Sequence, residues 1–384
     1  MGKLNIFEIS LGSAGGVVYS GQMMQGHVTV ELTEAMSMRG IILNFEGKAY
    51  VHWSTGGKNK RHYRATEKYF DQDVLLFGIW PSQGSDTVEL PSGRHTFPFQ
   101  FQLPEGLPSS FEGGVGHVRY QVKCKIDKPW KFDHNTKRPF TVISILDLNQ
   151  NASTYCRRLQ GTKRKHLCCL CCKSGPIEAS FHVDRQAYVP GEAVKLFAEI
   201  SNGTSRAMDK SYVDLKMVTT FHAKHKSKTT KTEVARVERP AIAGFREDSW
   251  SGENLVIPPL PPSFLVGCNI IDIHYILQLN VDPSGPALDL EVPLEIIIGT
   301  IPLQHIIEQF PPMSPSAYME CVTGKVDTRE DGDSQYLRGD LSFAPMYTYY
   351  NWGHSPAAIP QHTLRGKQSD EQTGLLQESG DNKK

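Results

Sequence analysis

The sequence has no excess of either charge, little helical periodicity and no long apolar run. Its 384 residues contain 41 Lys and Arg against 41 Asp and Glu, so bulk charge does not favour a nucleic-acid-binding protein. No run approaches the roughly 20 apolar residues that a membrane-spanning helix needs. The N-terminus also lacks the hydrophobic core of a signal peptide. The sequence therefore predicts a cytoplasmic protein with no nucleic-acid partner.

The motifs of the common enzyme classes are missing as well. The chain contains no Gly-x-Ser-x-Gly, phosphate-binding loop, dinucleotide fingerprint or His-Glu-x-x-His. None of its 14 histidines pairs with carboxylates at a recognisable catalytic spacing. Because catalysis requires several groups that converge in one pocket, we expect no enzymatic activity and no cofactor.

The eight cysteines do not resemble a secreted disulfide framework, because four of them lie together at Cys168, Cys169, Cys171 and Cys172. Three interpretations of this cluster remain open. A zinc site would need ligands from elsewhere, since one pentapeptide cannot complete a tetrahedron. Palmitoylation would suit the neighbouring basic run at residues 163–165, which favours an anionic membrane surface. In the simplest interpretation, the thiols pack as small apolar groups. No other metal site is predicted.

Short strands separated by Gly, Pro and Ser dominate the chain, and this pattern is typical of a β-sandwich or barrel. One arrangement occurs twice. A proline-rich corner at residues 103–113 leads into an alternating strand that ends at Asp127, and residues 257–264 lead into a similar strand that ends at Asp282. This internal repeat predicts two similar domains.

The corner residues are interpreted as scaffold, and Arg119 is the member whose charge is worth testing. The scaffold residues are Pro104, Pro108, Phe111, Arg119 and Tyr120 in the first copy, and Pro258, Pro262, Phe264 and Tyr275 in the second. From residue 311 onward the sequence is rich in Pro, Ser, Gly, Asp and Gln with little apolar periodicity, which predicts a disordered tail.

Two blocks of sequence resemble the arrestins. Residues 90–113 and 118–130 closely resemble the arrestin N-terminal signature, and residues 172–177 and 188–192 are similar to the start of the arrestin C-terminal domain. In detail the chain is most similar to the α-arrestins, the arrestin domain-containing proteins.

The resemblance implies an all-β protein with two immunoglobulin-like β-sandwich domains in the arrestin fold. Residues 1–172 would form the N-like sandwich, residues 173–303 the C-like sandwich and residues 304–384 the disordered tail. It also implies an adaptor that binds transmembrane receptors or transporters and recruits ubiquitin ligases for endocytosis or endosomal sorting. Such a protein would lie in the cytoplasm, peripherally at the plasma membrane and endosomes. The alternative is an arrestin-fold binding module, retromer-like or thioredoxin-binding-like, that recruits no ligase.

The tail departs from the family pattern. Most α-arrestins carry Pro-Pro-x-Tyr motifs that bind WW domains of HECT-type ubiquitin ligases, through a preformed polyproline turn and a tyrosine. This chain has no intact copy; its nearest variants run from Pro315 to Tyr318 and from Pro345 to Tyr347, and each lacks one proline. We therefore expect weak or absent WW binding.

Two further features are candidate contact sites. Glu371, Leu375 and Leu376 fit the acidic dileucine pattern that clathrin adaptors bind, although the pattern is short and also arises by chance. Basic loop tips are either simply solvated or contact phosphorylated cargo tails or inositol-lipid headgroups. The candidate residues in these tips are Lys58, Lys60, Arg61 and Arg64 in the first half, and Lys224, Lys226 and Lys228 in the second.

Overall fold

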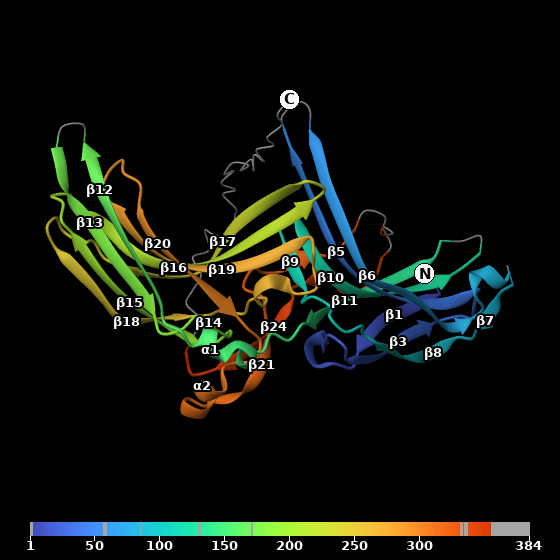
Figure 1. The fold of residues 1–384 in the computed structure, drawn as a ribbon. Coiled ribbons are helices and arrows are strands. Elements are labelled where there is room, and N and C mark those ends of the chain that lie inside the picture. The colour runs from blue at the N-terminus through green and yellow to red at the C-terminus, as the bar shows by residue number, and fades with distance from the viewer. Residues whose placement is uncertain are drawn as a thin grey trace, which may run out of the picture.

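The computed structural model of the protein describes residues 3–56, 60–84, 86–129, 132–169, 172–330, 333 and 337–354, apart from the side chains at 168, 169 and 172–174. Within these residues the chain forms two β-sandwiches that lie side by side, with tail segments packed between and beneath them (Figure 1). The predicted fold class of two β-sandwich domains is confirmed.

The first sandwich consists of two main sheets. The smaller sheet has the order β1-β3-β8, with β1 (Leu4–Leu11), β3 (Met23–Leu32) and β8 (Gly93–Gln102). The larger has the order β2-β11-β10-β5-β6, with β9 beside β10; its strands are β2 (Val17–Tyr19), β11 (His134–Ile143), β10 (Gly116–Asp127), β5 (Gly40–Thr55), β6 (Arg61–Gly78) and β9 (Phe111–Gly113). Short strands β4 (Met36–Met38) and β7 (Val88–Leu90) pair separately, and 3-10 turns occur at Ala14–Gly16 and Pro81–Gln83.

The second sandwich repeats this plan. One sheet has the order β12-β13-β15-β18, with β12 (Leu159–Cys169), β13 (Cys172–Val183), β15 (Ala193–Asn202) and β18 (Glu247–Val256). The other has the order β14-β20-β19-β16-β17, with β14 (Ala187–Tyr188), β20 (Leu290–Ile298), β19 (Ile271–Pro283), β16 (Met208–Ala223) and β17 (Lys226–Arg239). A 3-10 turn (Leu148–Asn151) and helix α1 (Ala152–Tyr155) connect the sandwiches, and another 3-10 turn covers Ser263–Leu265.

The predicted domain boundary between residues 172 and 173 lies at a hairpin of the second sandwich. It falls inside the hairpin of β12 and β13, which pair along their length from Leu159 opposite Val183 to Cys169 opposite Cys172. Because both strands belong to one sheet of the second sandwich, the first sandwich ends before β12.

The predicted extent of the disordered tail needs correction. Between residues 304 and 354 the structure contains α2 (Gln304–Gln309), β21 (Ser314–Glu320), β22 (Val326–Asp327), β23 (Ser342–Phe343) and β24 (Met346–Asn351). Strand β21 pairs with β24, and β22 pairs with β23. These segments lack the periodicity of a self-contained element because their apolar partners lie on the two sandwiches. Residues 355–384 lie outside the described residues.

The repeated corner anchors each sandwich through a buried tyrosine. The hydroxyl of Tyr120 on β10 donates to the carbonyl of Pro108 over 2.8 Å, and that of Tyr275 on β19 donates to the carbonyl of Pro261 over 2.7 Å. Both tyrosines are fully buried. A buried carbonyl without a donor is costly, so these bonds fix where each proline-rich loop meets its strand. The repeat found in the sequence is therefore a repeat of one structural device.

A serine in each corner adds an equivalent contact. The hydroxyl of Ser110 accepts from the backbone N–H of Val142, and the hydroxyl of Ser263 accepts from the N–H of Ile298, each over 2.9 Å. Both serines are buried. The corner is thus tied to two strands of the same sheet, as a tyrosine corner ties the strands of immunoglobulin-like sandwiches.

Removing either corner hydroxyl should destabilise the protein. We expect Tyr120→Phe and Tyr275→Phe each to lower the free energy of unfolding by roughly 1–2 kcal/mol, because a buried carbonyl loses its donor. Urea unfolding would measure the change. Tyr349→Phe is the matched control, since Tyr349 is also buried but its hydroxyl has no hydrogen-bond partner. A loss in the control as large as in the corner variants would contradict the assignment.

Candidate functional site: a cationic cluster closed by the tail

Four cations gather on the outer face of the larger sheet of the first sandwich. They are Lys48 on β5, Arg119 and Lys123 on β10, and Lys137 on β11, and we call them the cationic cluster. Alternation along β10 explains the placement, because Tyr120 and Val122 point into the core and their neighbours point outward. Arg119 lies opposite Lys48 and Lys123 lies opposite Lys137 in the sheet register. Like charges in opposite positions repel, so this arrangement requires nearby carboxylates.

The first sandwich supplies two of those carboxylates. Glu112 accepts two hydrogen bonds from the guanidinium of Arg119, each over 2.8 Å, and both side chains are buried. Glu46 contacts Lys48 over 2.8 Å and Lys123 over 2.7 Å. Burial alone would raise the pKa of Glu46, but hydrogen bonds from Lys123, Lys48 and Gln121 outweigh it and hold the pKa at about 2. Four cations and two carboxylates leave the sheet itself with two uncompensated positive charges.

The tail supplies the other two carboxylates. Glu330 lies 3.0 Å from the ammonium of Lys48 and 3.6 Å from that of Lys123, and its second oxygen is 3.9 Å from Arg119. Asp333 lies 3.1 Å from the buried ammonium of Lys137, which also donates to the carbonyl of Thr328 over 2.7 Å. Glu330 and Asp333 thus bring the cluster to charge balance.

The charges of the cationic cluster balance, but some of its buried polar atoms have no hydrogen-bond partner. Among the described residues, Nε2 of His117, Oε1 of Gln121 and Oε1 of Glu330 are buried without a hydrogen-bond partner. Burial lowers the pKa of His117, and the charges of Arg119 and Lys48 lower it further, to about 3. The imidazole is therefore neutral and adds no positive charge. The two oxygens are acceptors, so full hydrogen bonding of the site would need a donor that neither the sheet nor the described tail supplies.

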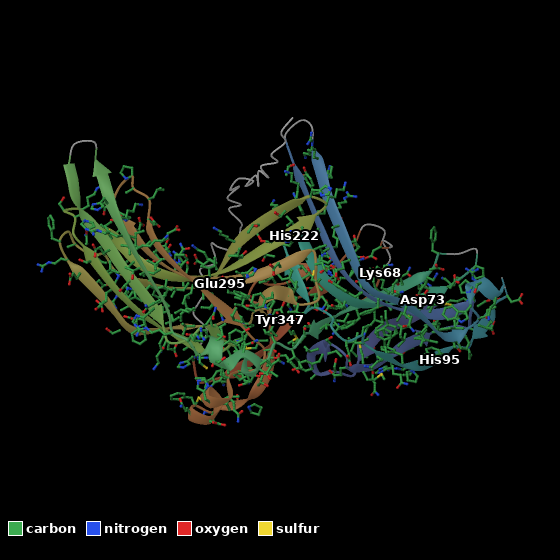
Figure 2. The ribbon with its side chains drawn as sticks, viewed as in Figure 1. Lys68, Asp73, His95, His222, Glu295 and Tyr347 are labelled. Carbon is green, nitrogen blue, oxygen red and sulfur yellow. The ribbon has the colours of Figure 1, made fainter. Side chains whose placement is uncertain are left out.

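The remainder of the tail holds both sandwiches. Tyr347 is buried between them (Figure 2), and its hydroxyl donates to the carbonyl of Ser110 in the first corner over 2.7 Å. The N–H of Tyr350 donates to the carbonyl of Pro190, and that of Val322 to the carbonyl of Pro259, both in the second sandwich. Removal of the tail would therefore release contacts on both domains.

The two WW-binding candidates lie in this docked tail. Tyr347 and Pro345 are buried, whereas Pro315 is exposed and Tyr318 is half-buried. The hydroxyl of Tyr318 donates to that of Tyr19 over 3.1 Å. WW docking needs an accessible tyrosine ring, so Pro345 and Tyr347 are not presented for it in this conformation; their role in ligase binding stays a prediction.

The basic loop tips lie outside the cationic cluster. Lys60, Arg61, Arg64, Lys224 and Lys226 are exposed, Lys228 is half-buried, and within the described part of the chain none of the six forms a salt bridge. The structure brings them to the ends of the β5–β6 and β16–β17 hairpins, which cross one another (Figure 1). Their contact with cargo or lipid stays a prediction.

Several predicted site residues cannot be placed. Lys58, Cys171 and the dileucine residues Glu371, Leu375 and Leu376 lie outside the described residues, as do the side chains of Cys168, Cys169 and Cys172. Among the described residues, no group of three or more His, Cys, Asp or Glu could hold a metal ion.

The scaffold residues lie in the two corners and on the strands that follow them. Pro108, Phe111, Tyr120, Pro258, Pro262 and Tyr275 are buried; Phe264 is half-buried and Pro104 is exposed. Arg119 differs from the rest because it faces the cationic cluster. Lys48, Lys123 and Lys137 were missed because they stand singly on three strands rather than in one run. The polar alternation Arg119, Gln121, Lys123 along β10 was the available signal.

Two comparisons with known proteins identify the family to which the two sandwiches belong. The family model for the N-terminal domain of arrestin (or S-antigen) matches residues 7–149, and that for the C-terminal domain matches residues 173–303. The chain belongs to the arrestin family. Membership of this family supports an adaptor role. Among the described residues, no helix is long and apolar enough to cross a membrane.

The alignments with three relatives cover most of this chain and most of each relative. Arrestin domain-containing protein 4 of Homo sapiens is 34% identical over 294 residues, which are 75% of this chain and 69% of the relative. Arrestin domain-containing protein 1 of Homo sapiens is 32% identical over 317 residues, 82% of this chain and 68% of the relative. Arrestin domain-containing protein 17 of Caenorhabditis elegans is 29% identical over 317 residues, 79% and 72% of the two chains.

The half-buried imidazole of His117 makes stability depend on pH. Its pKa is near 3 in the folded arrestin and about 6.5 when exposed, so the unfolded chain takes up a proton first as the pH falls. The stability that it contributes is therefore lost below about pH 6.5, at up to roughly 1.4 kcal/mol per pH unit. We expect the difference in unfolding free energy between wild type and His117→Gln to shrink from pH 7 to pH 5. Exposed His305→Gln is the control; parallel wild-type and His117→Gln curves would contradict the assignment.

Proposed function

We propose that this arrestin-family chain is a non-enzymatic adaptor in membrane-protein trafficking, which binds transmembrane cargo and links it to ubiquitination and to endocytic or endosomal sorting. The observation that carries the proposal is the closure of the cationic cluster by Glu330 and Asp333. A cytoplasmic segment of cargo that carries an acidic or phosphorylated group would bind the cluster in their place. The proposed location is the cytoplasm, with peripheral contact at the plasma membrane and endosomes.

The charges support a phosphorylated ligand. Without the tail, Lys48, Arg119, Lys123 and Lys137 face only Glu46 and Glu112, which leaves an excess of two positive charges. A phosphate monoester carries about −1.5 to −2 at neutral pH and three strong acceptor oxygens. It could therefore balance the charge and accept hydrogen bonds from Lys48, Arg119 and Lys123 in place of Glu330.

A phosphopeptide titration tests this exchange. We expect the full chain with Glu330→Gln and Asp333→Asn to bind a fluorescent phosphoserine peptide about tenfold more tightly than wild type, because the peptide no longer competes with the tail carboxylates. Lys48→Gln with Lys123→Gln should bind about tenfold more weakly than wild type, and Lys60→Gln with Arg61→Gln is the matched control at a loop tip. Equal affinities for wild type and both cluster variants would count against the proposal.

Recruitment of HECT-type ligases is the weaker half of the proposal, and clathrin adaptors would act through residues that the structure does not describe. Since Pro345 and Tyr347 are buried, the observation favours a second candidate function: an arrestin-fold regulatory module that binds its partner without a ligase. Proximity labelling in cells, with and without residues 301–384, would separate the two by the presence of ligases among the labelled proteins.

A pull-down with tandem WW domains gives a direct test. We expect wild type to bind weakly through the accessible Pro315–Tyr318 variant, so that Tyr318→Ala abolishes capture and Tyr347→Phe leaves it unchanged. Absence of capture for wild type would reject ligase recruitment through these motifs and leave the regulatory-module alternative.

A further inference from the structure

The outer face of the larger sheet in the second sandwich carries charges of the opposite sign to the cationic cluster. Its strands bring three rows of side chains into register across β17, β16, β19 and β20. We call these rows the anionic face: Glu238, Tyr212, Asn280 and Glu291; Arg236, Asp214, Gln278 and Pro293; Glu233, Lys216, Ile276 and Glu295. Five carboxylates meet two cations in these rows, and Lys210, two residues before Tyr212 on β16, contacts Glu238 over 3.1 Å.

Asp214 lies at the centre of this face and is almost fully buried. Its Oδ2 atom is 3.3 Å from the ammonium of Lys216 and 3.8 Å from the guanidinium of Arg236. Its Oδ1 atom is buried and has no hydrogen-bond partner. An ionised carboxylate with one unbonded oxygen is costly to bury, so it favours a donor from outside the domain.

The two cations of the face are shared among several acids. The guanidinium of Arg236 stacks on the ring of Tyr212 at 4.1 Å and also contacts Glu233 and Glu238. Its Nε atom remains without a partner. Arg236 and Lys216 therefore cannot neutralise all the carboxylates around them.

The negative charge is least compensated along β20. Glu291 forms no salt bridge among the described residues, and Glu295 contacts only His274. Both glutamates are exposed, and Figure 2 shows Glu295 on the side of the second sandwich that looks toward the first. Burial raises the pKa of nearby Asp289, and the charges of Asp282 and Glu291 raise it further, as expected where negative charges accumulate.

We propose that the anionic face is a docking surface for a Lys/Arg-rich polypeptide segment of the cargo. Exposed Glu291 and Glu295 would attract the segment, and one of its basic side chains would donate to Oδ1 of Asp214. This proposal rests on the proposed function, since cytoplasmic segments next to membrane-spanning helices are enriched in Lys and Arg. The two sandwiches would then bind opposite charges on one cargo chain: an acidic or phosphorylated segment on the first and a basic segment on the second.

Fluorescence anisotropy with a labelled Lys/Arg-rich peptide and the full chain tests the surface. We expect Glu291→Gln with Glu295→Gln to weaken binding about fivefold, as removal of two exposed ion pairs does. Glu199→Gln with Glu247→Gln is the matched control. These exposed glutamates lie on β15 and β18 of the opposite sheet, each beside a serine hydroxyl, and the charge change is identical. The control should change affinity by less than about twofold.

A second variant tests the buried carboxylate. Asp214→Asn keeps the shape of the side chain and should weaken binding by about tenfold or more, because the charged acceptor is lost. A peptide in which Gln replaces every Lys and Arg should not bind. If the Glu291/Glu295 variant and the Glu199/Glu247 control weakened binding equally, the affinity would depend only on the net charge of the protein. That result would overturn the proposal. Failure of wild type to bind the basic peptide would also overturn it.

The phosphopeptide titration separates this proposal from the proposed function. Neutralising Glu291 and Glu295 should leave phosphopeptide affinity within about twofold, and neutralising Lys48 and Lys123 should likewise leave binding of the basic peptide unchanged. If the phosphopeptide binds and the basic peptide does not, docking at the anionic face is rejected and the proposed adaptor function stands. If only the basic peptide binds, docking at the anionic face stands and ligand exchange at the cationic cluster is rejected.

Discussion

One hydrogen bond in each sandwich determines where the surface chemistry lies. The tyrosine hydroxyl that donates to a corner proline holds β10 in the first domain and β19 in the second. Alternate residues of a strand face opposite sides, so anchoring Tyr120 inward places Arg119 and Lys123 outward. Anchoring Tyr275 inward places Gln278 and Asn280 on the outer face by the same parity. A register shift of one residue would bury the charges and expose the tyrosines, and the corner prevents it.

The same architecture thus carries two faces of opposite charge. On the first, repulsion between cations in opposite positions is relieved by acids from elsewhere in the chain, half of them from the tail. On the second, carboxylates outnumber their intrachain partners, and Asp214 keeps an unbonded oxygen. Buried charges left partly unsatisfied cost stability, so they are expected where a surface has a task besides folding.

The strands and the corner were predictable because they depend on local pattern: period-2 alternation, proline corners and a repeated Tyr. The family resemblance rested on the same residues. Docking of residues 304–354 was not predictable, because the partners of Tyr347 and Glu330, Ser110 and Lys48, lie 237 and 282 residues away in the sequence. Basic runs such as Lys224 to Lys228 are visible in the sequence, whereas the four residues of the cationic cluster are spread over three strands. The pairing of β12 with β13 was also not predictable, because nothing in the sequence of β12 indicates which sandwich it joins.

Attachment of Glu330 and Asp333 to the same chain has a further consequence for any competing ligand. A tethered group acts at an effective concentration on the order of millimolar, whatever the total amount of protein. A free peptide in dilute solution must overcome that advantage through affinity alone. A segment confined to a membrane beside the protein has a comparable local concentration of its own. The tail would therefore make occupancy of the cationic cluster depend on the crowding of ligands at a surface rather than on their number in the cell.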